Sequence, residues 1–258
     1  MFKAARLVGV ILGLVGSWIL ATHALAGPPY LTDDPEPVDY RHWEVYFASL
    51  TTQLPSGYTG TSPHVEVNYG AAPNLQLHTI VPYAFSAAQG TSAFGLGDIE
   101  LGAKYRFVRE GRSMPMVGTF PLLEVPAGNA ARGLGTGHLH AYLPIWLQKS
   151  WGPWQTYGGG GYWINPGLGN RDYWFSGCLI QRDLSPHLTL GNEIYYTSSP
   201  MTSEPRNLNF NFGGQYNFDD GHHLLFSAGR SILGATGLTT YAAYQWTFGP
   251  REKQGKGT

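Results

Sequence analysis

The sequence has little of what stabilises an ordinary soluble or secreted domain. Charged residues make up 13% of the 258 residues, about half the share of roughly 25% in a typical soluble domain. Cys178 is the single cysteine, which excludes an internal disulfide framework. After residue 26, no run approaches the ~18 apolar residues of a transmembrane helix. The formal net charge of -1 gives no electrostatic reason to expect a nucleic-acid partner.

Glycine and aromatic residues are abundant instead, with 35 Gly and 14% aromatics. The clearest pattern is in residues 207–218, NLNFNFGGQYNF, where apolar residues such as Phe210 and Phe212 alternate with amides such as Asn209 and Asn211. Such alternation is typical of a strand with a different environment on each face. The run exceeds the usual strand of about 5–6 residues and has the length that a tilted strand needs to cross a bilayer. We interpret it as a wall strand of a membrane barrel.

The N-terminus resembles a secretory signal. Lys3 and Arg6 precede an apolar stretch at 7–20, and Ala24-Leu25-Ala26 forms a small-residue cleavage site. We therefore predict a signal peptide at residues 1–26 that is cleaved after Ala26. The alternative, an uncleaved anchor, is disfavoured because the apolar run is short and rich in glycine.

Residues 27–41 follow as a predicted extended periplasmic leader, because their prolines disfavour both helix and central strand. The acids of this leader raise the possibility of cation binding, but acids beside turn prolines are more often simply solvated. These acids are Asp33, Asp34, Glu36 and Asp39.

Residues 42–248 contain twelve strand-like runs. They are 42–53, 61–71, 75–87, 96–108, 114–125, 137–149, 154–164, 172–184, 187–198, 207–218, 223–233 and 238–248. Short connections (73–74, 109–113, 150–153, 185–186 and 219–222) alternate with mostly longer ones (54–60, 88–95, 126–136, 165–171, 199–206 and 234–237). This alternation is typical of an outer-membrane barrel with a periplasmic N-terminus. The prediction is an all-β fold, a single antiparallel transmembrane β-barrel of twelve strands, followed by a polar tail at 249–258.

Some residues interrupt the pattern. Pro82, Pro121 and Pro144 lie within predicted strands, and each removes a ladder donor, so we expect bulges there. The phase of the strand stays open around Pro121 and in 172–184. The glycines at 158–161 could form a phosphate-binding loop, but no helix follows them. A bend in the barrel wall is the favoured interpretation.

The polar faces of the strands predict which residues line the lumen. These are Glu66, His78, Glu100, Lys104, Arg106, His138, His140, Glu193, Asn207, Asn209, Asn211 and Gln215. The charged members are expected to pair across strands and fill the interior, and also to border a narrow aqueous path, since a barrel of this size leaves little room.

Two groups of residues have the side chains needed for metal binding or for hydrolysis. His138 and His140 share a strand face and could both reach one metal, but no carboxylate nearby in the sequence completes a site. Ser176, His187 and Asn192 are nominal members of a hydrolase triad, but none lies in a recognisable motif. We predict no catalytic residue, no metal site and no cofactor.

Several stretches resemble a known family. They are 27–46 (GPPYLTDDPEPVDYRHWEVY), 143–167 (LPIWLQKSWGPWQTYGGGGYWINPG), 171–184 (RDYWFSGCLIQRDL) and 187–196 (HLTLGNEIYY). They are similar to the Gram-negative outer-membrane proteins named for the MetA pathway of phenol degradation, often labelled simply transporter. The resemblance spans nearly the whole mature chain. It implies a β-barrel with a loose association to uptake of aromatic compounds, and it carries no catalytic motif.

The expected function is passage of small solutes, aromatic ones among them, across the outer membrane, with the N-terminus in the periplasm. The alternatives are a lipid-modifying hydrolase of the outer membrane and a non-conducting structural barrel. The expected partners are outer-membrane lipid and lipopolysaccharide, the solute and the barrel-assembly machinery, with no nucleic acid.

Overall fold

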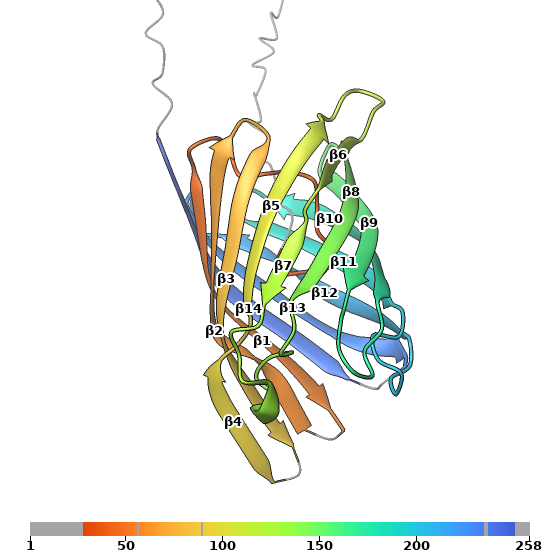
Figure 1. Ribbon diagram of the computed structural model, residues 1–258. Helices are drawn as coiled ribbons and strands as arrows, with labels where there is room; N and C mark the ends of the chain where they lie inside the picture. Colours follow the sequence, from red (N-terminus) through yellow and green to blue (C-terminus); the bar gives the residue numbers. More distant parts are fainter. Residues whose placement is uncertain (1–27, 56, 89, 235–236, 251–258) are drawn as a thin grey trace, which may run out of the picture.

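The computed structural model describes residues 28–55, 57–88, 90–234 and 237–250. The predicted signal peptide and most of the predicted tail lie outside the described residues. The strands form one antiparallel sheet that closes on itself, because β1 (Trp43–Leu54) pairs with both β2 (Gly57–Ala72) and β14 (Leu238–Phe248) (Figure 1). Among the described residues, no helix has the length and apolar character of a helical membrane span.

In the described parts of the chain, fourteen strand segments make up the sheet. Those between β2 and β14 are β3 (Leu75–Ala88), β4 (Thr91–Leu96), β5 (Ile99–Val108), β6 (Met116–Thr119), β7 (Leu122–Val125), β8 (His140–Trp151), β9 (Trp154–Ile164), β10 (Tyr173–Ser185), β11 (Leu188–Thr197), β12 (Asn207–Asn217) and β13 (His222–Leu233). A short 3-10 helix, Ala130–Arg132, lies in the connection before β8.

The fourteen segments form twelve wall strands, as predicted. The segments β4 and β5 both pair with β3 and are two parts of one strand. Likewise β6 and β7 both pair with β5 and β8. The second interruption falls at Phe120 and Pro121, where the missing N–H of proline ends the ladder.

The three prolines within strands behave differently. Pro82 borders a register shift between β2 and β3, as expected of a bulge. Pro144 pairs with Gly161 in regular register, so the bulge expected there is absent. Pro144 stands opposite the break at Pro121, and its carbonyl accepts a bond from Thr119 Oγ1 at 2.6 Å. Because the ladder is already interrupted opposite Pro144, the missing N–H of this proline removes little further hydrogen bonding.

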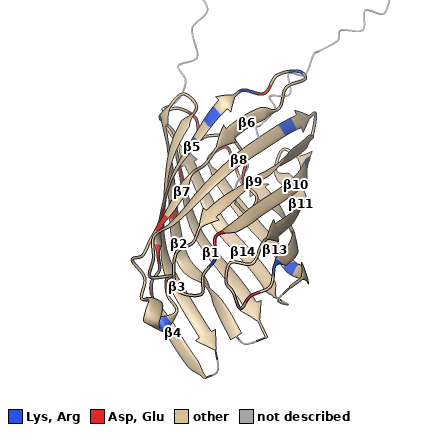
Figure 2. Cartoon of the chain, turned by 45° about the vertical axis from the view of Figure 1, so that its right-hand side comes forward, with Lys and Arg blue, Asp and Glu red and all other residues tan. Residues whose placement is uncertain are grey.

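Side chains alternate between the outer face and the interior as the sequence predicted. On β12, Phe210 and Phe212 are exposed while Asn211 is buried. The phase left open in β10 is now settled, since Leu179 and Gln181 point inward and Ile180 outward. Charged residues are sparse along the wall strands (Figure 2).

The two ends of the barrel differ. The turn end carries the short connections 73–74, 152–153, 186–187 and 218–221, and the longer 109–115. The loop end carries 126–139, 165–172 and 198–206. Two loops predicted at this end are wrong, because most of 54–60 and of 88–95 is strand and the hairpins project beyond the wall (Figure 1). Both stretches contain Thr, Tyr or Phe, which favour strand.

Candidate functional site

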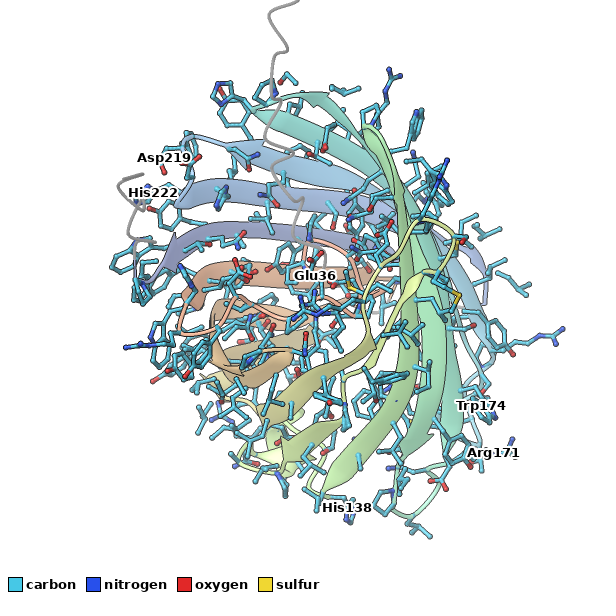
Figure 3. All side chains as sticks on the ribbon, turned by 90° about the horizontal axis from the view of Figure 1, so that it is seen from above. Glu36, His138, Arg171, Trp174, Asp219 and His222 are labelled. Carbon is cyan, nitrogen blue, oxygen red and sulfur yellow. The ribbon has the colours of Figure 1, made fainter. Side chains whose placement is uncertain are left out.

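The interior of the barrel is crossed by residues 28–41, which we call the N-terminal segment. Thr32 and Asp34 in this segment have no exposed surface. In the view down the barrel, Glu36 lies near the centre of the ring of strands, while His138 and Trp174 lie at its periphery (Figure 3). These residues were predicted to form an extended periplasmic leader, and no pattern in the sequence indicates that they run through the lumen.

A buried carboxylate on β11 holds the backbone of the segment. Glu193 Oε1 accepts hydrogen bonds from the backbone N–H of Leu31, at 3.0 Å, and of Thr32. Its Oε2 accepts a bond of 2.6 Å from Asn211 Nδ2. The carboxylate has no exposed surface. Charge-assisted bonds of this kind are roughly twice as strong as neutral ones, so Glu193 is a principal anchor of the segment.

The cations of the lumen pair with the acids of the segment. Lys104 Nζ lies 2.8 Å from Asp33 Oδ1 and 3.4 Å from Asp34 Oδ2, and Arg106 Nη1 lies 3.6 Å from Glu36 Oε1. Burial raises the pKa of Asp34 well above its ordinary value, and the ammonium of Lys104 partly offsets this effect. The expected pairing across strands is therefore wrong for Lys104 and Arg106, because their acidic partners belong to the N-terminal segment.

Amides and a hydroxyl of the wall complete the polar contacts. Gln76 Oε1 accepts from the backbone N–H of Val38 at 2.9 Å, and Gln148 Nε2 donates to Glu36 Oε2 at 3.1 Å. On the other side of the lumen, Ser227 Oγ donates to the carbonyl of Pro29 at 2.6 Å. The segment is thus tied to strands around much of the ring.

Three wall glycines make room for the segment. A Cβ at Gly118 would lie 2.9 Å from Pro35 Cβ, and one at Gly191 would lie 2.8 Å from Tyr30 Oη. A Cβ at Gly177 would overlap Thr32 Oγ1. These close approaches show that the inner surface of the wall is shaped to the segment.

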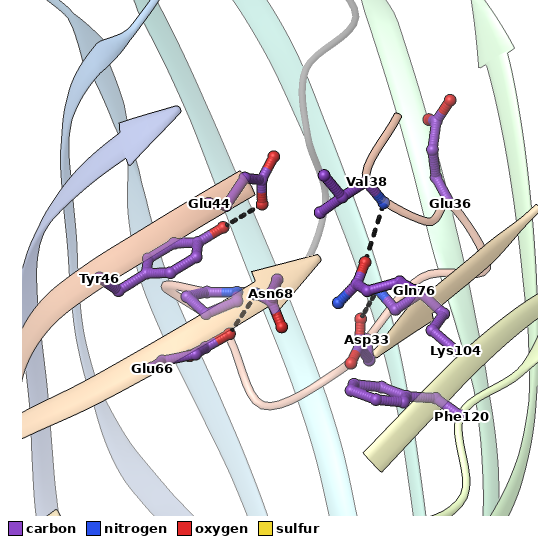
Figure 4. A pocket seen from close by; sticks show the side chains of 11 residues that line it. Asp33, Glu36, Val38, Glu44, Tyr46, Glu66, Asn68, Gln76, Lys104 and Phe120 are labelled. Atoms are coloured by element: carbon purple, nitrogen blue, oxygen red, sulfur yellow. Dashed lines mark hydrogen bonds and ion pairs between the residues drawn. The ribbon is translucent and has the colours of Figure 1, made fainter. Parts of the chain in front are cut away.

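The segment divides the lumen into unequal spaces. On the loop side lies a cavity of about 800 Å³, which we call the vestibule. On the turn side, two cavities measure about 20 Å³ and about 10 Å³, and a single water needs roughly 10–15 Å³. The larger of the two is bordered by Glu44, Glu66 and Lys104 (Figure 4).

The lining of the vestibule is acidic and aromatic. Its carboxylates are Asp33, Glu66, Asp98, Glu100 and Glu124, and no Lys or Arg is among the described residues that line it. Its aromatic side chains include Phe120, Tyr142, Trp163, Tyr173, Phe175 and Tyr195. The rings of Tyr142 and Trp163 stack at 4.7 Å between centroids, and those of Trp163 and Tyr173 at 5.9 Å.

Histidines contact the vestibule carboxylates. His78 Nε2 lies 2.8 Å from Glu100 Oε1, and His140 Nδ1 lies 3.2 Å from Glu124 Oε2. The carboxylate beside His140, which no nearby sequence position provides, is thus supplied by the neighbouring strand β7. His138, in contrast, is exposed in the connection before β8. The predicted shared face of His138 and His140 is therefore wrong, and no described group of three such residues is placed to hold a metal ion.

The structure distributes the predicted lumen residues over distinct places. Glu66, His78, Glu100 and Asn211 border the vestibule, and Lys104, Arg106 and Glu193 hold the N-terminal segment. Gln215 borders the smaller turn-side cavity. Asn207 and Asn209 are half-buried on β12. The aromatic lining was not predicted, although Tyr142 shares the inward face of β8 with His140 and Gln148.

The nominal hydrolase residues are not brought together. Ser176 pairs with Tyr196 across β10 and β11, whereas Asn192 pairs with Ile180, four residues further along β10. His187 lies in the turn just before β11, where its Nδ1 contacts the carbonyl of Asn217. At about 3.3 Å per residue along a strand, Ser176 and Asn192 are too far apart to form a triad.

The chain matches no known family model and no curated protein sequence. It is similar in structure to an outer membrane channel from Pseudomonas putida F1, with a TM-score of 0.64 and 17% identity over 83% of this chain and 99% of that one. It is also similar to the KdgM porin, solved in complex with disordered oligogalacturonate, with a TM-score of 0.57 and 12% identity over 80% of this chain and 99% of that one. For the NanC porin the TM-score is 0.56 and the identity 6%, over 79% and 98% of the two chains. Likenesses at these identities establish the fold, a closed antiparallel β-barrel of the kind seen in porins and outer-membrane channels.

Proposed function

We propose that the protein is an outer-membrane channel for small solutes, with its N-terminus in the periplasm and its vestibule facing outward. The observation that carries the proposal is the vestibule of about 800 Å³ that ends at the N-terminal segment. The exposed outer residues of the wall, such as Leu143, Ile145 and Phe212, are apolar and suit contact with lipid. The longest connections lie at the loop end, which corresponds to the extracellular end in such barrels.

The finer assignment rests on the resemblance in sequence. The resemblance of the sequence to the family named for the MetA pathway of phenol degradation, together with the aromatic lining of the vestibule, supports aromatic compounds among the solutes. Lipid and lipopolysaccharide would surround the wall, and the barrel-assembly machinery would insert it.

In this proposal the N-terminal segment controls passage. The two turn-side cavities described above are of the size of single waters, so in this proposal a shift of the segment opens the path of a solute from the vestibule to the periplasm. The same small cavities favour a second candidate, a non-conducting structural barrel.

Current across planar bilayers separates the two candidates. The full-length mature chain is compared with a variant that lacks residues 28–39, which leaves every wall strand intact. A channel predicts a small current for the full chain and a larger one for the variant. If both proteins fold, by circular dichroism and heat-modifiable gel mobility, and neither carries current above the bare bilayer, the channel is rejected and the structural barrel is retained.

The matched control is Lys149→Met. Lys149 Nζ pairs with Glu110 at the turn end, at 2.8 Å, and has no contact with the N-terminal segment. Its replacement should leave the current of the full chain unchanged.

A further inference from the structure

The charges around the vestibule are not balanced. Asp33 is neutralised by Lys104, and Asp98 accepts bonds from the backbone N–H groups of Gly128 and Thr136, where it holds the connection 126–139. Three carboxylates of the lining then remain, those of Glu66, Glu100 and Glu124.

These three carboxylates have only imidazoles as ionic partners among the described residues. His78 lies 3.6 Å from Glu66 and 2.8 Å from Glu100, and His140 lies 3.2 Å from Glu124. His64 approaches Glu66 at 3.9 Å. His78 faces two of these carboxylates at once, and a histidine carries a charge only when it is protonated, unlike the ammonium and guanidinium groups that serve the N-terminal segment. The vestibule is therefore a place where a cation gains charge compensation.

Carboxylates and aromatic rings follow one another around the inner wall. Glu100 is the direct cross-strand neighbour of Glu124, and Glu124 that of His140 on β8. Tyr142 lies two residues further along the same face of β8 and pairs with Trp163 on β9. Neighbouring strands lie about 4.8 Å apart, so a ligand of roughly ten heavy atoms can contact a carboxylate with one end and an aromatic face with the other.

The volume of the vestibule also fits a small molecule, since such sites usually measure about 300–1,000 Å³. A metal ion is a poor fit, because no described cluster supplies three suitable ligands. Aromatic faces attract organic cations through the ring quadrupole. We infer that the vestibule binds small organic cations that join an ammonium group to an aromatic body, with the carboxylates of Glu100 and Glu124 taking the ammonium and the rings of Tyr142 and Trp163 taking the body. This inference names a solute class for the proposed channel and in that role rests on the proposed function.

The test is isothermal titration of the full mature chain in a neutral maltoside detergent. Three probes share one aromatic body and differ in the head group: 2-phenylethylamine, 2-phenylethanol and 3-phenylpropanoate. The amine should bind about tenfold more tightly than the alcohol, the difference of one charge-assisted contact, and the carboxylate should bind most weakly. Equal affinity for amine and alcohol, or tighter binding of the carboxylate, would overturn the inference.

Variants test which residues cause the preference for the amine over the alcohol. In Glu100→Gln/Glu124→Gln, the amine should lose its advantage over the alcohol, while the alcohol keeps its affinity. In Tyr142→Leu, the amine and the alcohol should weaken by the same factor. The control Glu110→Gln, in a turn outside the vestibule, should retain the wild-type order. If the amine keeps its advantage in the double variant, the assigned carboxylates are wrong.

The titration and the current are independent readouts. A current without preference for the amine refutes this inference and leaves the channel standing. Preference for the amine without a current keeps the binding site and removes the channel.

Discussion

The carboxylates on the two sides of the N-terminal segment have different ionic partners. On the turn side, Asp34 and Glu36 meet Lys104 and Arg106, and the remaining space holds about one water in each cavity. On the loop side, Glu100 and Glu124 meet only histidines beside a large cavity. For these four carboxylates, a permanently charged partner goes with dense packing, and an imidazole partner goes with contact to open space. The comparison separates charges that fix the segment from charges available to a solute.

The largest expected effect comes from the turn side. Lys104→Met leaves the buried carboxylate of Asp34 without its cation, and removal of one partner of a buried pair costs about 3–5 kcal/mol. The free energy of unfolding, from urea titrations in lipid vesicles, should fall by that order. Adding Asp34→Asn should restore part of it. A loss below about 1 kcal/mol, the range of exposed pairs, would show that Lys104 does not fix the segment.

The second prediction tests which side chains of β12 face outward and which face the lumen. Phe212 is exposed at the centre of β12, whereas Asn209 is half-buried on the inner face. Arginine on the lipid face near the midplane should cost about 2–4 kcal/mol, so Phe212→Arg should lower the unfolding free energy far more than Asn209→Arg. Equal losses in the same titration would reverse the assigned phase.

A third substitution tests whether Glu193 anchors the N-terminal segment. Glu193→Gln keeps the shape but removes the charge that receives the backbone N–H groups of Leu31 and Thr32. Hydrogen bonds to charged groups contribute about 1.5–3 kcal/mol, so the segment should loosen and the bilayer current should rise. Cleavage within 28–41 by an added protease gives a second measurement. Unchanged current and unchanged cleavage would show that Glu193 does not anchor the segment.

In the vestibule, the matching substitution should have little effect on stability. Glu124 has a side chain 31% exposed and contacts only His140 as an ionic partner among the described residues, so Glu124→Gln should change the unfolding free energy by less than about 1 kcal/mol. The same titration in lipid vesicles measures it beside Lys104→Met. A loss as large as that of Lys104→Met would mean that the vestibule acids are structural too.

The smallest effect concerns the turn end and depends on pH. Burial alone would raise the pKa of Glu110, but bonds from Lys149 and Ser150 outweigh it and hold this pKa below its ordinary value. A lowered pKa in the folded state means that the stabilisation is present above the unfolded value of about 4.3 and is lost as the pH falls through the folded value. Relative to Glu110→Gln, the wild type should be more stable by at most about 1 kcal/mol near pH 7, and the two should converge as the pH falls through the folded pKa of Glu110. An advantage that grew on acidification would contradict the sign.

Much of the wall could be predicted because its signals are local. The alternation around Phe212 reflects two environments on either side of one strand, and the short turns break the strands where Pro and Asn stand. The errors at 54–60 and 88–95 arose because Gly and Ser suggested loops, whereas cross-strand pairs such as Phe85 with Phe94 favour strand. His138 was misassigned because the strand begins at His140, three residues later than the predicted start at 137.

By itself, the sequence determined the class of fold, the number of wall strands and which side chains face outward, because strand periodicity and turn chemistry act over a few residues. Only the tertiary structure decided the partners of the inward-facing charges. Asp33 and Lys104 are separated by 71 positions, and Leu31 and Glu193 by 162, and no local pattern relates them. Their pairing follows from closure of the ring, which encloses the N-terminal segment among groups that must compensate its acids and its backbone N–H groups. The vestibule is the space that this packing leaves.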